Sequence, residues 1–356
     1  MYAVIMAGGR GTRFWPLSRE KKPKHLLNIT GSQTVIQKTI ERIRPLIPQD
    51  NMYIITGESH CDEVIRQCSP VPEKNIVAEP VGRNTAPCIG LAALYIKQRD
   101  PDAVMIVLPA DHMITEEDRF REALVSAGEM AQRGNHLITI GIEPTEPATG
   151  YGYIEQGDLF TSIGGKDIFN VASIHEKPDL QRASKFIESG RFFWNSGIFV
   201  WKASTILSAI HNLLPDLYQG LEIIEKSLGT EEEKEVIREV YEKTDPISID
   251  YGVMEKVRGT LLMKGSFGWN DIGDWNALYD IFERDQAANA TRGPVIAVDS
   301  LDSLVYSPHK LVALVGVQDL IVVETEDALL ICHKDRSQDI KKVVEILEKE
   351  NMKKYL

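Results

Sequence analysis

A glycine-rich turn near the N-terminus is followed closely by basic residues. The turn continues directly from the apolar stretch Tyr2–Ala7. Its glycines are Gly8, Gly9 and Gly11. Glycines allow positive φ and let backbone amides approach an anion closely, while Arg13 and Lys24 add cations that suit phosphate oxygens. The spacing is neither the dinucleotide fingerprint nor the Walker loop, so it indicates another kind of phosphate-binding turn and makes a nicotinamide dehydrogenase remote.

The same segment forms a basic island in an acidic chain. The 356-residue sequence has a formal net charge of −12, whereas positions 10 to 24 hold several basic residues and one acid, Glu20. The overall charge argues against a general nucleic-acid binder, which would present a basic face. The island indicates a small anionic substrate, although a solvated basic loop would also explain it. The basic residues are Arg10, Arg13, Arg19, Lys21, Lys22 and Lys24.

Two aspartates stand where a metal ion could be held. Asp111 comes soon after the apolar run Val104–Leu108, and Asp271 lies in a glycine-flanked turn far along the chain. One or two carboxylates together with substrate phosphates describe a Mg²⁺ site. An aspartate after a strand is more often a helix cap or a turn residue, and Asp274 competes with Asp271 for the metal role. The residues alone leave these alternatives open.

The elements that must position these residues alternate in the first half of the chain. Continuous apolar runs, typical of buried parallel strands, are followed by segments of helical periodicity. This order predicts an α/β fold with a doubly wound, Rossmann-like sheet. Ligands bind such sheets at the carboxyl ends of the strands, which singles out the segments after Ala7 and Leu108. Strands are predicted over 2–7, 52–56, 76–78, 104–108 and 136–142, and helices over 58–67 and 118–132.

The pattern changes after about Gly293, where short apolar strands follow one another at roughly ten-residue intervals. This spacing predicts a small β-rich, β-helix-like domain that ends in a helix over 337–349. We therefore expect a catalytic domain over 1–288 and a C-terminal domain over 289–356. Between these patterns, strands are expected near 153–155, 169–177 and 197–201, and helices near 180–189, 205–210 and 230–243.

Several motifs together resemble those of the sugar nucleotidyltransferases, and in particular of the bacterial mannose-1-phosphate guanylyltransferases. The first motif runs from Gly8 to Ser18, and its Trp-Pro-Leu-Ser ending is similar to that of the mannose branch. Pro23 and Lys24 follow it, whereas His25 departs from the pattern because relatives often have glutamine there. The resemblance covers nearly the whole chain. Its other segments are Glu79–Pro87, Leu108–His112, Gly150–Ile154, Glu176–Pro178, Trp194–Gly197 and Trp269–Gly273.

The resemblance implies a role for each motif. Arg13 and Lys24 are expected to act on the phosphates as catalytic residues, and Asp111 and Asp271 to bind Mg²⁺. The residues expected to bind the nucleotide are Ala7, Gly8, Gly9, Gly11, Thr12, Glu79, Asn84, Thr85 and Pro109. Those expected to bind the sugar phosphate are Gly150, Glu176, Lys177 and Asn195. Because adjacent strand residues point to opposite faces, the Glu176–Lys177 pair requires an irregular backbone, which the following proline favours.

The resemblance implies transfer of GMP from GTP to α-D-mannose 1-phosphate, which gives GDP-mannose and pyrophosphate. A sugar-phosphate oxygen would attack the α-phosphorus directly, so that positioning and charge neutralisation are the main tasks. The residues do not exclude the same chemistry on another pair, such as glucose 1-phosphate with UTP or dTTP. A non-catalytic regulatory subunit of the same fold is a third hypothesis. It is disfavoured because all of the expected phosphate and metal residues are present: Arg13, Lys24, Asp111 and Asp271.

Nothing in the sequence indicates a membrane or an oxidising compartment. No apolar run approaches the roughly 18 residues of a membrane span, and the N-terminus lacks the pattern of a signal peptide. The cysteines Cys61, Cys68, Cys88 and Cys332 show no metal-ligand spacing and are expected to be reduced thiols. We expect a cytoplasmic enzyme whose partners are GTP and mannose 1-phosphate, with no nucleic-acid or membrane partner. A homodimer is compatible with the resemblance.

Overall fold

The computed structural model describes residues 1–9, 11–29 and 31–356. Arg10, a member of the basic island, lies outside the described residues. The chain divides into two compact units. The first unit comprises Met1–Gly8, Ile36–Ala110 and Ile114–Trp269, and the second comprises Gly9–Val35, Asp111–Met113 and Asn270–Leu356. The two-residue strands β5 (Met113–Ile114) and β11 (Trp269–Asn270) lie where the chain passes from one unit to the other.

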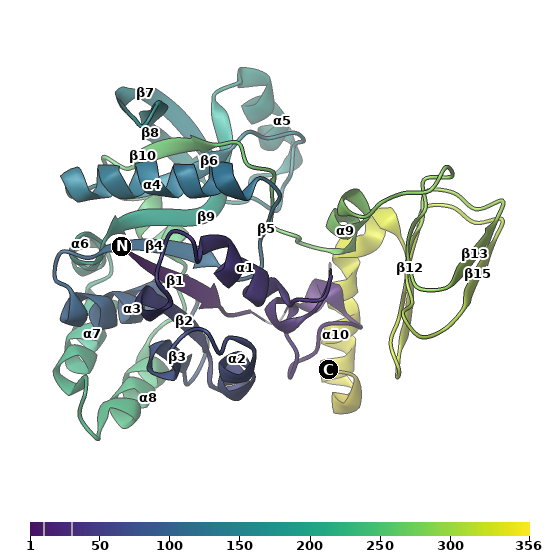
Figure 1. The fold of residues 1–356 in the computed structure, drawn as a ribbon, viewed down its shortest axis with the longest axis horizontal. Coiled ribbons are helices and arrows are strands. Elements are labelled where there is room, and N and C mark those ends of the chain that lie inside the picture. The colour runs from purple at the N-terminus through teal and green to yellow at the C-terminus, as the bar shows by residue number, and fades with distance from the viewer. Residues whose placement is uncertain (10, 30) are drawn as a thin grey trace. The chain divides into compact units, whose positions relative to one another are not determined.

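The first unit is built on one large mixed sheet. Its strands are β1 (Tyr2–Ala7), β2 (Met52–Gly57), β3 (Ile76–Glu79), β4 (Val104–Pro109), β6 (Ile138–Ile142), β7 (Tyr153–Ile163), β8 (Lys166–His175), β9 (Phe192–Lys202) and β10 (Leu261–Gly265). Among the described residues they follow the order β3-β2-β1-β4-β9-β6-β10-β8-β7 (Figure 1). The strands β1 to β4 run parallel, so that their carboxyl ends meet at one edge of the sheet.

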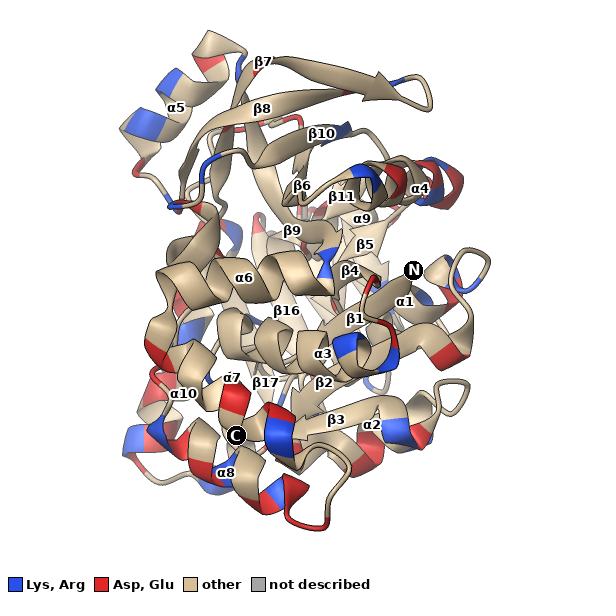
Figure 2. Ribbon diagram, turned by 90° about the vertical axis from the view of Figure 1, so that its left-hand side faces the viewer, with Lys and Arg blue, Asp and Glu red and all other residues tan. Residues whose placement is uncertain are grey.

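Helices cover both faces of this sheet (Figure 1). They are α1 (Val35–Ile43), α2 (Cys61–Gln67), α3 (Thr85–Arg99), α4 (Glu117–Arg133), α5 (Leu180–Ser189), α6 (Ala203–Leu213), α7 (Pro215–Ser227) and α8 (Glu233–Lys243). Helix α3 is buried along most of its length because it lies between the sheet and the pair α6 and α7. Its Leu91 shares a buried cluster with Val4, Val107 and Ile210. Acidic and basic residues alternate along the outer side of α8 (Figure 2).

The sequence prediction of these elements is largely confirmed. The strand β1 and the helix α5 coincide with their predicted ranges. The strand β8 ends at His175 rather than at Lys177, and β6 begins at Ile138 rather than at His136. The strand β10 was not predicted because its apolar residues are few and a lysine interrupts them.

The second unit contains a small β-helix-like body. A four-stranded sheet of described residues has the order β12-β14-β16-β17, and β13 pairs with β15. Parallel pairing of β12, β14 and β16, with only short connections between them, confirms the predicted stacked turns. The strands are β12 (Ala290–Arg292), β13 (Val295–Val298), β14 (Leu304–Tyr306), β15 (Val312–Val315), β16 (Leu320–Glu324) and β17 (Leu329–His333). The helix α9 (Trp275–Ile281) precedes them and α10 (Ile340–Lys349) follows, as expected for the chain end.

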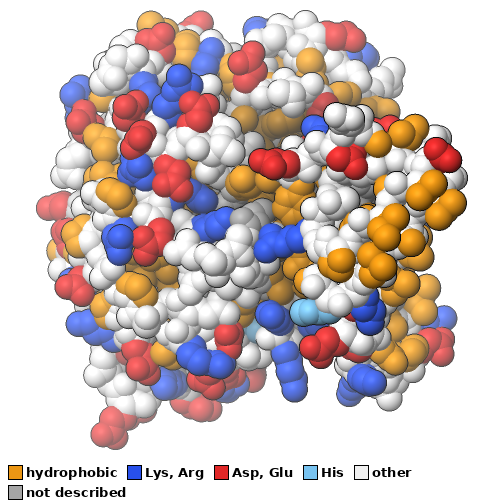
Figure 3. Space-filling model, turned by 45° about the vertical axis from the view of Figure 1, so that its right-hand side comes forward, with side chains coloured by type: hydrophobic (Ala, Val, Ile, Leu, Met, Phe, Trp, Pro, Cys, Tyr) orange, Lys and Arg blue, Asp and Glu red, His pale blue; other side chains and the backbone are white. Residues whose placement is uncertain are grey.

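One hydrophobic core holds the second unit together. Phe14 and Leu27, from the N-terminal segment, are buried in the same cluster as Trp275, Ile321 and Val344. The glycine turn is therefore part of the unit that contains the β-helix-like strands. Hydrophobic side chains also gather on an outer surface of these strands, at the right of Figure 3. They include Ile296, Val298, Leu311, Val315, Leu329 and Ile331.

Two further expectations concern the chain as a whole. In the part of the chain that the structure describes, no helix combines the length and the apolar character needed to cross a membrane. The four cysteines are free thiols, as the sequence predicts.

Candidate active site

In the second unit, the glycine turn packs directly against Lys24. Gly11 has φ of 60°, and a Cβ atom there would lie 2.7 Å from the Cβ of Lys24. Both the positive φ and this close approach require glycine. Gly9 has φ of 93°, and its Cβ would meet no atom within 4 Å among the described residues that are not its chain neighbours. The backbone at Gly9 is therefore open to an approaching group.

The ammonium group of Lys24 joins the two aspartates predicted to bind metal. Its Nζ lies 2.7 Å from Oδ2 of Asp111 and donates a hydrogen bond of 2.6 Å to the main-chain oxygen of Asp271. The lysine is 6% exposed, and its Nζ lies 5.6 Å from the ring centroid of Phe14. The structure thus brings together three residues that are far apart in the sequence.

Asp111 is held in its charged form. Burial raises the pKa of its carboxyl group, but the charges of Lys24, His112 and His25 and the Lys24 hydrogen bond together lower it to about 2. An ionised carboxylate is the hard oxygen ligand that Mg²⁺ prefers.

The structure also separates Asp271 from its competitor Asp274. The carboxylate of Asp274 caps α9, since its Oδ1 accepts hydrogen bonds from the backbone nitrogens of Asn276 and Ala277. Its Oδ2 accepts from Ser337 and Gln338. A side chain with this many partners serves the helix end and has little acceptor capacity left for a metal ion.

The carboxylate of Asp271 lies beside Gly273 in the same turn. A Cβ atom at Gly273 would lie 3.1 Å from its Oδ2 and 3.2 Å from its Oδ1. Among the described residues, no group of three or more histidine, cysteine or acidic side chains is arranged to hold a metal ion. A pair of aspartates nevertheless fits Mg²⁺, which is commonly bound by one or two carboxylates plus substrate phosphates.

Arg13 and Thr12 form the short 3-10 turn Thr12–Phe14 directly after the glycines. The guanidinium of Arg13 is exposed and donates a long hydrogen bond of 3.5 Å to the main-chain oxygen of Gly273. By contrast, Arg19 of the basic island is engaged with Asp327 at 2.7 Å. Of these two arginines, Arg13 is the one whose side chain is available to an anion.

The residues predicted to bind the nucleotide lie mainly at the carboxyl edge of the parallel strands in the first unit. Ala7, Glu79 and Pro109 end β1, β3 and β4. Asn84 caps α3, and its side chain accepts a hydrogen bond of 2.9 Å from the backbone nitrogen of Thr85. The strands therefore bring these predicted residues to one edge.

Two of these side chains are turned toward protein partners. The hydroxyl of Thr85 accepts a 2.8 Å hydrogen bond from the backbone nitrogen of Ile249. Glu79 is 6% exposed; burial raises the pKa of its carboxyl to about 7, and the nearby Tyr241 hydroxyl only partly offsets this. The binding roles predicted for Thr85 and Glu79 remain predictions.

The predicted sugar residues Glu176, Lys177 and Asn195 come together in the first unit. The amide Nδ2 of Asn195 lies 3.4 Å from Oε1 of Glu176, and a Cβ atom at Gly152 would lie 2.4 Å from the same oxygen. Lys177 has φ of 45° and follows the end of β8, so the predicted irregular backbone is confirmed. Gly150 lies in the adjoining loop, where a Cβ atom would meet no other described residue within 4 Å apart from its chain neighbours.

Two further carboxylates, which the sequence analysis missed, lie beside this group. Asn195 Nδ2 donates a 2.7 Å hydrogen bond to Asp250, and the backbone nitrogen of Glu176 donates to Glu255 at 3.1 Å. Asp250 begins the π-helical turn Asp250–Met254, a rare geometry found frequently at functional sites. The only sequence signal was a lone aspartate in an unassigned segment.

Crowding changes the protonation of these acids. Burial, followed by the charge of Asp250, raises the pKa of Glu176 to about 7, although Lys177 and the Asn195 amide oppose the shift. Burial likewise raises the pKa of Asp250. The carboxyl groups here are therefore less acidic than usual, whereas Asp111 is more acidic.

Strained backbone marks three of the predicted segments. Asn84, Lys177 and Ile272 have φ of 70°, 45° and 45° without being glycine. For a β-branched residue such as Ile272 a positive φ is a genuine outlier. Strain of this kind costs on the order of 1–3 kcal/mol and clusters at functional sites.

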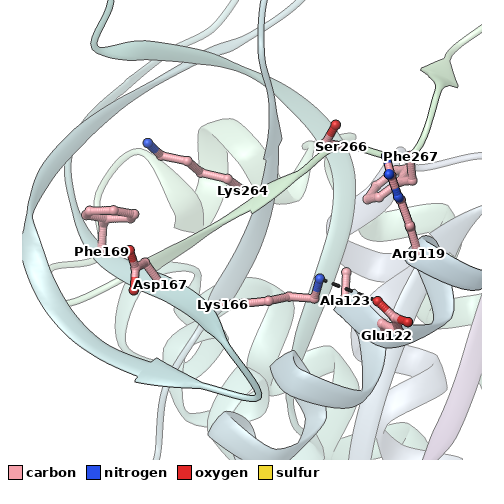
Figure 4. Close-up of a pocket in the computed structure, with 9 residues that line it drawn as sticks. All are labelled: Arg119, Glu122, Ala123, Lys166, Asp167, Phe169, Lys264, Ser266 and Phe267. Atoms are coloured by element: carbon pink, nitrogen blue, oxygen red, sulfur yellow. Dashed lines mark ion pairs between the residues drawn. The ribbon is translucent and has the colours of Figure 1, made fainter.

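A separate cavity of about 390 Å³ opens in the first unit between α4, β8 and β10 (Figure 4). Its lining carries both charges, and Lys166 forms an ion pair with Glu122 at 3.9 Å. The cavity is lined by Arg119, Glu122, Ala123, Lys166, Asp167, Phe169, Lys264, Ser266 and Phe267. None of the residues predicted to bind the nucleotide or the sugar phosphate is among them.

Comparisons with known proteins agree with this arrangement. Residues 2–288 match the nucleotidyl transferase family, and residues 293–347 match the MannoseP isomerase/GMP-like beta-helix domain. A structure from Thermus thermophilus, described as a mannose-1-phosphate geranyltransferase, superposes with a TM-score of 0.88 at 32% identity. That match covers 98% of this chain and 99% of the other.

Curated relatives are similar over almost the whole chain. A mannose-1-phosphate guanylyltransferase of Salmonella muenchen is 40% identical over 99% of this chain and 74% of its own length. A mannose-1-phosphate guanylyltransferase of Escherichia coli K12 is also 40% identical, over 97% of this chain and 73% of its own length. The chain therefore belongs to the nucleotidyl transferase family, among the mannose-1-phosphate guanylyltransferases.

Proposed function

We propose that this protein transfers GMP from GTP to α-D-mannose 1-phosphate and releases pyrophosphate. The single observation that carries the proposal is the buried Lys24 ammonium, which contacts both Asp111 and the main chain of Asp271 beside a glycine turn. A fixed cation next to carboxylates is suited to a reaction between two anions. The names of the relatives support the choice of guanine and mannose.

The proposed step is one direct displacement. An oxygen of the sugar phosphate forms a bond to the α-phosphorus of GTP, and the bond from that phosphorus to the bridging oxygen of the β-phosphate breaks. The electron pair leaves with pyrophosphate. Arg13 and Lys24 supply positive charge to the phosphate oxygens as the charge shifts, and the backbone amides of the glycine turn hold the triphosphate. No covalent enzyme intermediate is formed.

The residues of the first unit recognise the substrates in this proposal. Ala7, Glu79, Asn84, Thr85 and Pro109 lie at the ends of strands or the start of α3, where α/β sheets bind ligands. The remaining nucleotide contacts are assigned to Gly8, Gly9, Gly11 and Thr12. The sugar-phosphate contacts are assigned to Gly150, Glu176, Lys177 and Asn195. Of these side chains, the Glu176 carboxylate suits hydroxyl groups and the Lys177 ammonium suits the phosphate.

Mg²⁺ is the proposed cofactor, held by the carboxylates of Asp111 and Asp271. When bound, it would neutralise phosphate charge and orient the leaving group. The low pKa of Asp111, and the glycine at position 273 that leaves room for the Asp271 carboxylate, support the fit. Lys24 keeps Asp111 ionised and fixes the backbone at Asp271.

Several wider assignments remain proposals. We propose a catalytic domain over 1–288 and a C-terminal domain over 289–356, supported by family matches over 2–288 and 293–347. We also propose a cytoplasmic enzyme that acts on GTP and mannose 1-phosphate without a nucleic-acid or membrane partner. A homodimer is also proposed, and sedimentation velocity would measure the mass of the protein in solution to test it.

The decisive experiment measures pyrophosphate release for a grid of substrates. Four or five nucleoside triphosphates are combined with the 1-phosphates of mannose, glucose and N-acetylglucosamine, with and without Mg²⁺. We expect a sharp maximum at GTP with mannose 1-phosphate, abolished by a chelator. A maximum at another pair would keep the mechanism and overturn the specificity. No release on any pair would favour a regulatory subunit.

A further inference from the structure

Asp250 connects the sugar residues of the first unit to one another. Its Oδ1 accepts a 2.7 Å hydrogen bond from Asn195 Nδ2. The same amide nitrogen also lies 3.4 Å from Oε1 of Glu176. An asparagine amide has two N–H donors, so Asn195 directs both of them at carboxylates.

The other end of the Asn195 side chain is occupied as well. Its Oδ1 accepts hydrogen bonds from the backbone nitrogen of Gly197 at 3.2 Å and from the hydroxyl of Thr139 at 3.4 Å. The amide therefore has a protein partner for each donor and for its acceptor. It acts as a fixed bridge, while the carboxylates of Glu176 and Asp250 retain lone pairs for further donors.

The segment that carries Asp250 is tied to the start of α3. The backbone nitrogen of Ile249 donates to the Thr85 hydroxyl at 2.8 Å. Ile247 donates to the main-chain oxygen of Arg83 at 3.1 Å and accepts from the backbone nitrogen of Ala86 at 3.1 Å. Asp250 thus starts from an anchored backbone, which limits the positions that its carboxylate can take.

This arrangement keeps two acids close together at an electrostatic cost. Burial and neighbouring negative charge raise the pKa values of both Glu176 and Asp250. The charged and titratable groups around them are Lys177, Glu255 and Tyr251. Neighbouring acids whose pKa values are raised by burial and by nearby negative charge occur preferentially at functional sites.

We propose that Asp250 is a positioning residue of the sugar site, which holds Asn195 and, through it, the Glu176 carboxylate in place for adjacent hydroxyl groups of a hexose 1-phosphate. The inference rests on the function proposed above and deepens it. Hydroxyl groups donate to carboxylate oxygens, so two acceptors fixed on either side of one amide suit a pair of neighbouring hydroxyls. Loss of the Asp250 carboxylate leaves one Asn195 donor without its acceptor and frees Glu176 to move.

The test compares Asp250→Ala and Asp250→Asn in steady-state turnover of GTP and mannose 1-phosphate with Mg²⁺. We expect Asp250→Ala to raise KM for the sugar phosphate about tenfold or more, with KM for GTP changed less than about twofold. Asp250→Asn retains an acceptor oxygen, so it should recover much of the loss. Asp245→Ala, at an exposed acid in the same segment, is the matched control and should change neither KM.

Calorimetric titration of each variant with mannose 1-phosphate alone provides a readout that does not need turnover. Selective weakening of this binding in Asp250→Ala, with recovery in Asp250→Asn, supports the inference. Equal changes in both KM values, or no change in sugar binding, would overturn it. If Asp250→Ala does not fold, Asp250→Ser takes its place, since the shorter side chain cannot reach Asn195 Nδ2 as the carboxylate does; unchanged sugar KM and binding in that variant would overturn the inference. A wild-type protein that binds mannose 1-phosphate but turns over no pair would refute the proposed function alone.

Discussion

The two units place carboxylates in opposite electrostatic settings. In the second unit, the Lys24 ammonium lies 2.7 Å from Asp111, and the pKa of this acid falls to about 2. In the first unit, burial and then the negative charges of Asp250 and Glu255 raise the pKa of Glu176 to about 7. Burial raises the pKa of both acids; the Lys24 ammonium overcomes this effect at Asp111, whereas the charge of Asp250 adds to it at Glu176.

The difference corresponds to two chemical tasks. A carboxylate that must bind a cation has to be ionised under all working conditions, and a nearby lysine ensures this. Carboxylates that only accept hydrogen bonds from hydroxyl groups can tolerate crowding and partial protonation. We therefore expect substitutions around Lys24 and Asp111 to reduce turnover, and substitutions around Glu176 to change sugar binding.

The largest expected effect comes from removal of the cation in the second unit. Lys24→Met should lower kcat/KM on the order of 10²–10³-fold, because a preorganised charge is lost at the reacting phosphates. Steady-state pyrophosphate release measures this change, and thermal unfolding shows whether the variant is folded. Lys22→Met, at an exposed lysine two positions earlier, is the matched control. Equal losses in both variants would contradict a specific role for Lys24.

A methyl group added at Gly152 should disturb the sugar residues alone. Its Cβ would lie 2.4 Å from Oε1 of Glu176, so Gly152→Ala must displace that carboxylate. We expect KM for mannose 1-phosphate to rise about 10–100-fold, as small misplacements near reacting groups do. Gly82→Ala adds the same methyl group where no other described residue beyond the chain neighbours lies within 4 Å, and it should leave this KM unchanged. A larger effect on GTP than on the sugar would reverse our assignment.

The corresponding substitution in the second unit is milder. A Cβ at Gly273 would lie 3.1 Å from Oδ2 of Asp271, which requires only a small shift of the carboxylate. Gly273→Ala should raise the Mg²⁺ concentration for half-maximal rate by about tenfold, in the range seen when groups around a metal ligand are changed. Saturating Mg²⁺ should restore most of the rate. An unchanged Mg²⁺ dependence would argue against Asp271 as a ligand.

The smallest expected effect concerns stability and pH. Because the pKa of Glu176 is raised in the folded state, its favourable contribution is full below its usual pKa of about 4.5 and is lost as pH rises through about 7. Lys177, Asp250, Glu255 and Tyr251 are the charged and titratable groups that face it.

Glu176→Gln removes this titration, so its free energy of unfolding should gain on the wild type by on the order of 1–2 kcal/mol between pH 5 and pH 8.5. Urea unfolding at several pH values measures the difference. Glu188→Gln, at an exposed acid of α5, should show no such trend. A constant difference between Glu176→Gln and wild type would refute the assignment of the shift.

Most secondary structure could be predicted because it depends on local patterns. The apolar runs of β1 and β4, and the stacked strands after Gly293, are visible as uninterrupted or regularly spaced hydrophobic residues. The glycine turn could also be predicted, because glycines directly after an apolar run indicate a turn with positive φ. The structure has φ of 60° at Gly11. What the sequence did not reveal is the partnership between distant residues, such as Lys24 with Asp111.

Two features were missed for physical reasons. Asp250 lies in a π-helical turn, which has no periodic signature, and the burial of an acid cannot be inferred from its neighbours in the sequence. The inclusion of Phe14 and Leu27 in the core of the second unit also depends on packing against Trp275 and Ile321. Such long-range contacts leave no local pattern. The motif residues could be identified early, but their partners required the folded chain.

The assembly of the second unit from separated chain segments has a consequence during synthesis. Phe14 and Leu27 are synthesised early, whereas Ile321 and Val344, which complete their core, follow only after the whole of the large sheet. Because domains fold as units while the chain emerges, the turn that carries Lys24 can be packed only after the strands and the helix that follow Gly293 have been made. Prematurely terminated chains can fold strands of the large sheet but cannot organise that turn. Truncated chains that lack the strands after Gly293 should therefore show no transferase activity, rather than reduced activity.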